Sequence, residues 1–178
     1  MSSRRVLKLV PAATLAAGLF GLILPDALEA AGKQEEAKKY HEQLKTAKDP
    51  KKKVEALEEL ARLGQIMKSL AEPALPDMMK ALGDKDPAVR KAAAESVGKC
   101  DPDPKEAVPA LTKLLTDDKD EGVRVAAAHG LGYMGETAKD AVKDLREVAK
   151  ANKKSDGKPN NLGRAANEAV RLINVKRK

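Results

Sequence analysis

Two histidines and one cysteine are the side chains in this sequence best suited to catalysis or metal binding. His41 and His129 lie far apart in the chain, without the short spacing typical of paired metal ligands. Neither belongs to a zinc-protease, nucleophile-elbow, phosphate-loop or dinucleotide-binding motif. We therefore expect no catalytic residue, no metal site and no cofactor, and we interpret His129 as a groove or surface residue.

Cys100 is the only cysteine, which excludes a disulfide within the chain. It follows Gly98 closely, at the expected end of a helix. We expect it to pack as a small apolar residue. A free thiol, a disulfide to another molecule and an attachment point for a ligand remain as alternatives.

A near-duplication predicts the elements that would position these residues. Residues 74–98 read ALPDMMKALGDKDPAVRKAAAESVG, and residues 107–132 read AVPALTKLLTDDKDEGVRVAAAHGLG. The arginines Arg90 and Arg124 align, as do Gly98 and Gly132, at a spacing of 34 residues. Such a period is typical of a solenoid, in which each unit buries its apolar face against its neighbours.

Each copy predicts an antiparallel pair of helices. Pro109 is expected in the first turn of a helix, where its missing N–H costs little, and a leucine stripe at helical spacing follows it. A polar run after that stripe ends the first helix and can cap the second. The second helix carries many alanines, which favour close approach between helices. Its apolar face is Val123, Ala126, Ala127 and Leu131.

The segments from Asp86 to Gly98 and from Asp120 to Gly132 resemble HEAT repeats, most closely a short bacterial type first described in phycobilin lyases. The resemblance implies a stacked polar ladder between a turn aspartate and an arginine early in the second helix. The matching positions are Asp86 with Arg90, and Asp120 with Arg124. The resemblance implies the fold but no single function, because this family includes scaffolds, lyase subunits and nucleic-acid binders.

The N-terminal residues 1–30 read as an export signal. Basic residues are followed by a charge-free apolar run, Leu9 to Leu24, which is shorter than the roughly 20 residues of a membrane span. We expect cleavage after Ala30 and a periplasmic or extracellular protein. An uncleaved N-terminal anchor and a wrongly assigned start are alternatives, and a twin-arginine signal is a minor one.

We predict an all-α fold: an α-solenoid of about four antiparallel helix pairs over residues 31–178. Leu60 to Gly64 resembles the end of the second helix of each clear copy, so residues 33–64 are expected to form a degenerate first unit. For its first part, residues 32–48, a helix and a partly disordered leader are both possible. The predicted units are about 33–64, 72–100, 105–135 and 137–175.

The net charge of +7 is concentrated near the C-terminus, where residues 139–178 carry twelve basic and five acidic side chains. This segment could bind an anionic partner such as an envelope polymer or a phospholipid surface. A solvated capping helix is the alternative interpretation. We expect no nucleic acid, because of the export signal and the scarcity of aromatic residues for base stacking.

The remaining prediction is a non-enzymatic, monomeric scaffold or adaptor of the cell envelope that binds a protein partner. In HEAT-like arrays the second helices line the concave face, and the candidate residues here lie at successive turns of those helices. Tyr133 with His129 is the expected centre of the interface, and packing of Tyr133 on Met134 and the next unit is the alternative. Binding of an anionic polymer or membrane surface through the basic C-terminal unit, and a lyase-like enzyme subunit, are alternatives. The candidate partner-binding residues are Lys91, Glu95, Lys99, Val125, His129 and Tyr133.

Overall fold

The computed structural model describes residues 25–153 and 157–175, and these residues are almost entirely helical. The only β-pairing among them is an isolated bridge between Lys153 and Pro159. The chain divides into two units, residues 1–32 and 33–178. The elements are α1 Pro25–Thr46, α2 Pro50–Ile66, α3 Lys68–Ala71, η1 Glu72–Ala74, α4 Leu75–Ala81, α5 Pro87–Lys99, α6 Pro104–Asp117, α7 Glu121–Met134, η2 Gly135–Ala141, α8 Val142–Ala151 and α9 Asn161–Asn174.

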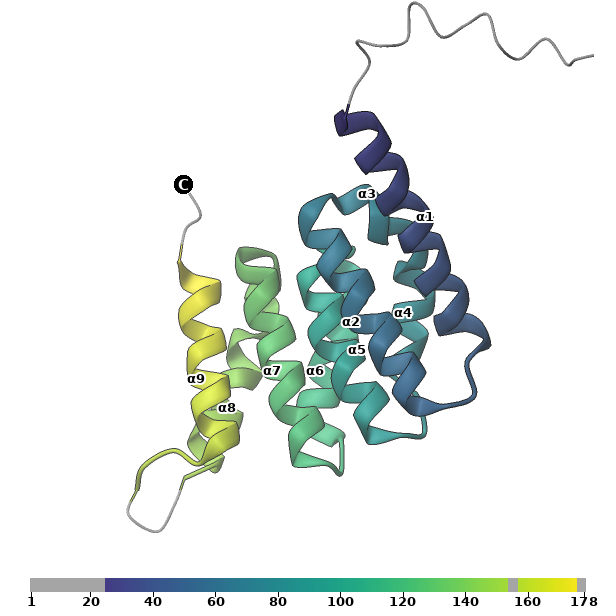
Figure 1. Cartoon of the computed structure of the whole chain (residues 1–178). Helices are drawn as coiled ribbons and strands as arrows, with labels where there is room; N and C mark the ends of the chain where they lie inside the picture. Colours follow the sequence, from purple (N-terminus) through teal and green to yellow (C-terminus); the bar gives the residue numbers. More distant parts are fainter. Residues whose placement is uncertain (1–24, 154–156, 176–178) are drawn as a thin grey trace, which may run out of the picture. The chain divides into compact units, whose positions relative to one another are not determined.

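The helices pack as two layers (Figure 1). The second helices of successive pairs form one layer, in which α2 packs on α5, α5 on α7 and α7 on α9. The other layer contains the first helices: α4 pairs with α5, α6 with α7, and α8 with α9. The prediction of an all-α array of packed helix pairs is confirmed. The predicted export signal lies mostly outside the described residues, and α1 runs through its last six residues.

Three helix starts share one local device. Asp49, Asp86 and Asp103 each precede a proline at the first helical position, and each carboxylate accepts a backbone N–H two residues on. Proline loses nothing there, because the N–H it lacks has no partner in the first turn. An aspartate side chain satisfies one of the donors left free at that end and complements the helix dipole.

One helix start differs from the prediction. Pro109 was expected in the first turn, but Asp103 and Pro104 begin α6 five residues earlier, so Pro109 lies inside the helix. Its ring removes one backbone hydrogen bond. Pro109 is exposed, and the strong apolar stripe of α6, which buries Ala107, Leu111 and Leu115, holds the helix in place.

The core is built from aliphatic side chains and alanine. Alanine on the second helices brings their backbones close together, as the sequence predicts. The closest approach is between α5 and α7, where a Cβ added at Gly98 would lie 2.3 Å from the carbonyl oxygen of Gly130. Only glycine allows this approach. The largest fully buried side chains are Leu57, Leu60, Leu63, Met78, Leu111, Leu115, Leu131, Leu145, Leu162, Ile173, Val89 and Val97.

Candidate partner-binding surface

The six candidate residues lie on α5 and α7, two neighbouring helices of the second-helix layer, and all of them are at least partly exposed. On α5, Lys91 is exposed while Glu95 and Lys99 are half-buried. They are four residues apart, so they share one face of the helix. Val125, His129 and Tyr133 follow the same spacing on α7, and Tyr133 is 41% exposed. We call this set, together with the α2 residues described next, the second-helix face.

Aligned positions of α5 and α7 meet across the helix interface. His129 Nδ1 lies 3.9 Å from Glu95 Oε1. Lys99 Nζ lies 5.1 Å from the centre of the Tyr133 ring, within range of a cation–π interaction. Val125 packs against the core. The structure therefore brings together four of the six candidates as two pairs.

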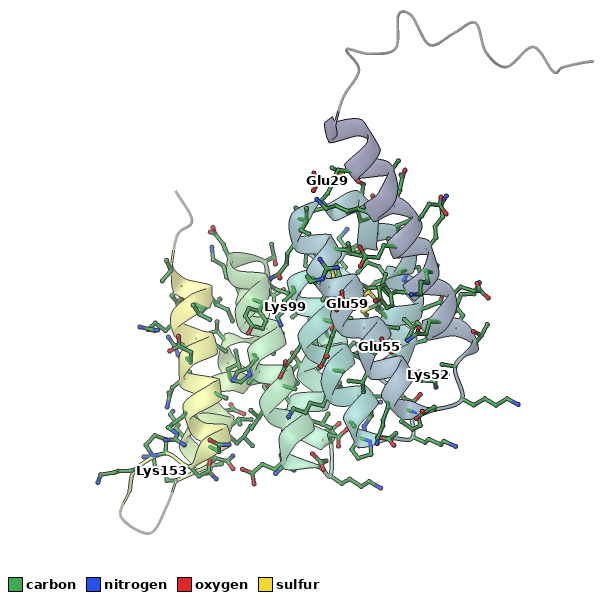
Figure 2. The ribbon with its side chains drawn as sticks, in the orientation of Figure 1. Glu29, Lys52, Glu55, Glu59, Lys99 and Lys153 are labelled. Carbon is green, nitrogen blue, oxygen red and sulfur yellow. The ribbon has the colours of Figure 1, made fainter. Side chains whose placement is uncertain are left out.

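The second-helix face continues onto α2, which the sequence analysis left out. Figure 2 shows Glu55 and Glu59 along α2, beside α5 with Lys99. A groove between these two helices is lined by Glu58, Arg62 and Gln65 of α2 and by Glu95 and Lys99 of α5. Each of the two helices contributes one acidic and one basic side chain to the groove, so the groove is not charged with one sign only.

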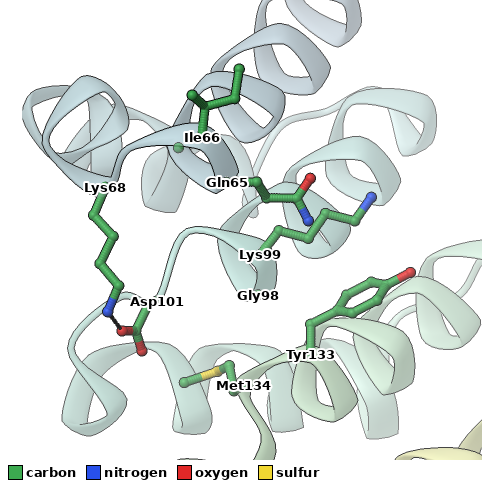
Figure 3. Close-up of a pocket in the computed structure, with 9 residues that line it drawn as sticks. Gln65, Ile66, Lys68, Gly98, Lys99, Asp101, Tyr133 and Met134 are labelled. Carbon is green, nitrogen blue, oxygen red and sulfur yellow. Dashed lines mark hydrogen bonds and ion pairs between the residues drawn. The ribbon is translucent and has the colours of Figure 1, made fainter.

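A cavity of about 450 Å³ lies at the C-terminal ends of α2, α5 and α7 (Figure 3). Tyr133 and Lys99 border one side of it, and an ion pair between Lys68 and Asp101 borders the other. Its remaining lining residues are Gly64, Gln65, Ile66, Gly98 and Met134.

The sequence analysis missed Gln65, Ile66, Lys68 and Asp101, although a signal for the first two was present. The helices α2, α5 and α7 each carry a glycine near their C-terminal end, and the cavity is lined by residues that follow Gly64, Gly98 and Gly132. Aligning those three glycines would have placed Gln65 and Ile66 beside Lys99 and Tyr133.

Exposed large apolar side chains gather at the same ends. Ile66 is 51% exposed, Met67 49%, Tyr133 41%, Leu172 38% and Val175 56%. All five lie in the last turn of α2, α7 or α9 or directly after it, and these helices end on one side of the array (Figure 1). Leu172 also lies against Gly132, next to Tyr133. Grouped exposure of apolar side chains is typical of an interaction surface.

The predicted pairing of the polar ladder is wrong. Asp86 and Asp120 cap the N-termini of α5 and α7, where they accept the backbone N–H groups of Ala88 and Val123. The acid that holds Arg90 is Asp118 of the next unit, with Nε at 2.7 Å and Nη2 at 2.9 Å from its two oxygens. Arg124 donates to the backbone oxygen of Asp118 at 2.8 Å.

The ladder therefore joins one unit to the next. Lys53 of α2 binds Asp84 at 2.6 Å in the same manner, and Arg90 then binds Asp118. The Arg90 and Asp118 side chains are only 10% and 6% exposed. The hydrogen bond from Arg90 holds the pKa of Asp118 below its usual range, against the opposing effect of burial.

The remaining titratable candidates are occupied or buried. His41 Nε2 lies 2.9 Å from Asp77 Oδ2 and so joins α1 to α4. The Cys100 side chain is buried beside Gly64. Burial raises the pKa of this thiol to about 11, against the opposing effect of the Lys99 charge. A thiol in this state is a poor nucleophile at neutral pH.

We expect Cys100 to resist alkylation in the folded protein. Both its burial and its raised pKa disfavour the reactive thiolate. With iodoacetamide at neutral pH, labelling should be at least about a hundredfold slower than in urea-unfolded protein, followed by mass spectrometry. Rapid labelling of the native chain would instead support the alternative of an attachment point for a ligand.

Within residues 25–153 and 157–175, no three His, Cys, Asp or Glu side chains group closely enough to hold a metal ion. In the same part of the chain, no helix combines the length and apolar character needed to cross a membrane.

Comparison with known proteins identifies the repeats. The family model for HEAT repeats matches residues 37–106 and 100–158, which together are more than half of the chain. No curated protein matches the sequence. The matched segments contain α2 through α8, the helices whose pairing and inter-unit ladder are described above. The chain therefore belongs to the HEAT-repeat family.

Proposed function

We propose that this protein is a non-enzymatic scaffold or adaptor of the cell envelope, which binds a protein partner through the second-helix face. HEAT repeats generally serve as protein-interaction scaffolds. The observation that carries the proposal is the combination of Tyr133, supported by Lys99, with Ile66 at a single cavity. Tyrosine is enriched in interface centres, because it buries a large rigid ring while its hydroxyl remains bonded.

The envelope location rests on the sequence of residues 1–30. The proposal assigns no catalytic residue. His41 is engaged with Asp77, and the Cys100 thiol is buried with a raised pKa. The interface is expected to be small and transient, since a short array offers a limited area for contact.

Replacing Tyr133 by alanine should weaken capture of the native partner about tenfold or more, because hot-spot truncations cost roughly 2 kcal/mol. The partner is first identified by cross-linking of the full chain in its native host, followed by mass spectrometry. Affinity is then measured for wild type and variant by biolayer interferometry.

Lys113→Ala is the matched control for this experiment, because Lys113 is exposed on α6, in the other layer. Both variants should keep the helical circular dichroism and melting temperature of the wild type. Undiminished affinity of Tyr133→Ala would refute the second-helix face as the binding surface.

A second candidate function is binding of an anionic polymer through residues 139–178, favoured by their twelve basic and five acidic side chains. Some of these charges are already paired, as in Lys139–Glu136 and Arg171–Glu168. An anion binder should be retained on a heparin column and lose that retention when residues 176–178 are removed. A protein scaffold should show little change.

A further inference from the structure

Arg90 and Arg124 occupy the same place in successive units. Each is the fourth residue of its helix, and each uses Nη1 to bind a backbone oxygen of the preceding turn: Asp84 at 2.9 Å and Asp118 at 2.8 Å. Arg90 then uses Nε and Nη2 to hold the carboxylate of Asp118 from the following unit. The chain itself thus shows which ligand this anchored guanidinium takes.

The described residues of the following unit supply no such ligand to Arg124. Asn152 caps the C-terminus of α8 where Asp118 caps α6, so a neutral amide replaces the acid. The amide is engaged locally: its Nδ2 donates to Val148 O at 2.8 Å, and its Oδ1 accepts from Asn160 at 3.3 Å. Among the described residues, Arg124 has no carboxylate within ion-pair distance.

Arg124 borders a cavity of about 410 Å³ between the third and fourth helix pairs. Two acidic residues of α8, the half-buried Asp144 and the exposed Glu147, line the same cavity. Neither of them has an ion-pair partner within the described part of the chain. The rest of the lining is mainly aliphatic or small: Leu115, Thr116, Val148, Ala151, Asn152 and Leu162.

We propose that this cavity binds a segment of a partner protein in which an aspartate or glutamate is followed by a basic residue. Arg124 holds the carboxylate through Nε and Nη2, in the two-point geometry seen at Arg90. Asp144 and Glu147 attract the basic residue that follows the acid in the ligand. Their negative charge also disfavours a simple anion as the ligand. The cavity is lined by none of the residues of the second-helix face, so the proposal stands or fails independently of the function proposed above.

The test uses the full chain and two capped dipeptides, acetyl-Asp-Lys-amide and acetyl-Asn-Lys-amide, which differ only in the carboxylate. Binding is followed by the NMR signals of the arginine Nε–H groups. The aspartate peptide should shift the Arg124 signal saturably, and the asparagine peptide should bind roughly tenfold or more weakly, as expected for charged hydrogen bonds. The Arg90 signal should not move, because that side chain is already occupied.

Two variants locate the site. Arg124→Gln should abolish binding, whereas Asn152→Asp should fill the position from within the chain, abolish binding and raise the melting temperature. Two results would overturn the proposal: no saturable shift of the Arg124 signal, or equal binding of both peptides.

Discussion

Replacing Arg90 by methionine is expected to destabilise the protein by about 3–5 kcal/mol, because it leaves a buried carboxylate without its counter-ion. Asp118 is 6% exposed and receives two hydrogen bonds from Arg90. Asp118 also lies at the boundary between two helix pairs. Without Arg90 its charge would be buried and unpaired, which weakens the packing between those pairs. The measurement is urea unfolding at neutral pH, followed by far-UV circular dichroism.

Arg124→Met is the matched control for this change. Arg124 occupies the same helix position and makes the same type of bond to a backbone oxygen, but no carboxylate of the described chain is paired with it. Its loss should cost about 1 kcal/mol or less. Adding Asp118→Asn to Arg90→Met should recover part of the lost stability. Equal costs for the two methionine variants would show that the ion pair contributes nothing.

The same ion pair predicts a dependence of stability on acid. Because the pKa of Asp118 is lowered in the folded protein, chiefly by Arg90, its contribution is fully present above the unfolded-state pKa of about 3.9. The contribution is lost as the pH falls from that value through the folded-state pKa. The difference in stability between wild type and Arg90→Met should therefore shrink as the pH is lowered below about 4.

The ladder shows what one sequence can and cannot predict. The repeat period and the alignment of Arg90 with Arg124 were readable, because the two copies keep the same residue types at matching positions. The nearest aspartates, Asp86 and Asp120, cap their own helices, whereas Asp118 pairs with an arginine of the preceding unit. Pairing between units depends on how the hairpins stack, which no single repeat encodes. The turns before α5 and α7 both read Asp-Lys-Asp, so the sequence offered a second acid for this role in each turn, Asp84 and Asp118.

The candidate surface was partly predictable for a related reason. Spacing along α5 and α7 placed Lys99 and Tyr133 at aligned positions, and the structure shows them in contact. The contribution of α2 was missed, because the first unit diverges in sequence and only the short stretch from Leu60 to Gly64 marks the register. The start of α6 was misplaced for another reason: Pro109 is tolerated inside a helix that Asp103 and Pro104 begin.

Replacing Gly98 by alanine should be among the most damaging small changes in the protein. A Cβ at this position would lie 2.3 Å from Gly130 O and 2.5 Å from Gly130 Cα, both backbone atoms that cannot rotate away. The α5 and α7 helices would have to separate along their shared interface. We expect a loss of at least about 3 kcal/mol, the upper part of the usual range for overpacking, measured by urea unfolding.

Gly32→Ala, measured in the uncleaved chain, is the control, because it makes the same chemical change in a helix, α1, where the added Cβ would meet no atom outside its own stretch of helix within 4 Å. Alanine is the better helix former, so this variant should be stabilised by up to about 1 kcal/mol. The opposite signs expected for one substitution separate helix propensity from packing. If Gly98→Ala also stabilised the protein, α5 and α7 could not approach as closely as described, and the stacking of units two and three would need another explanation.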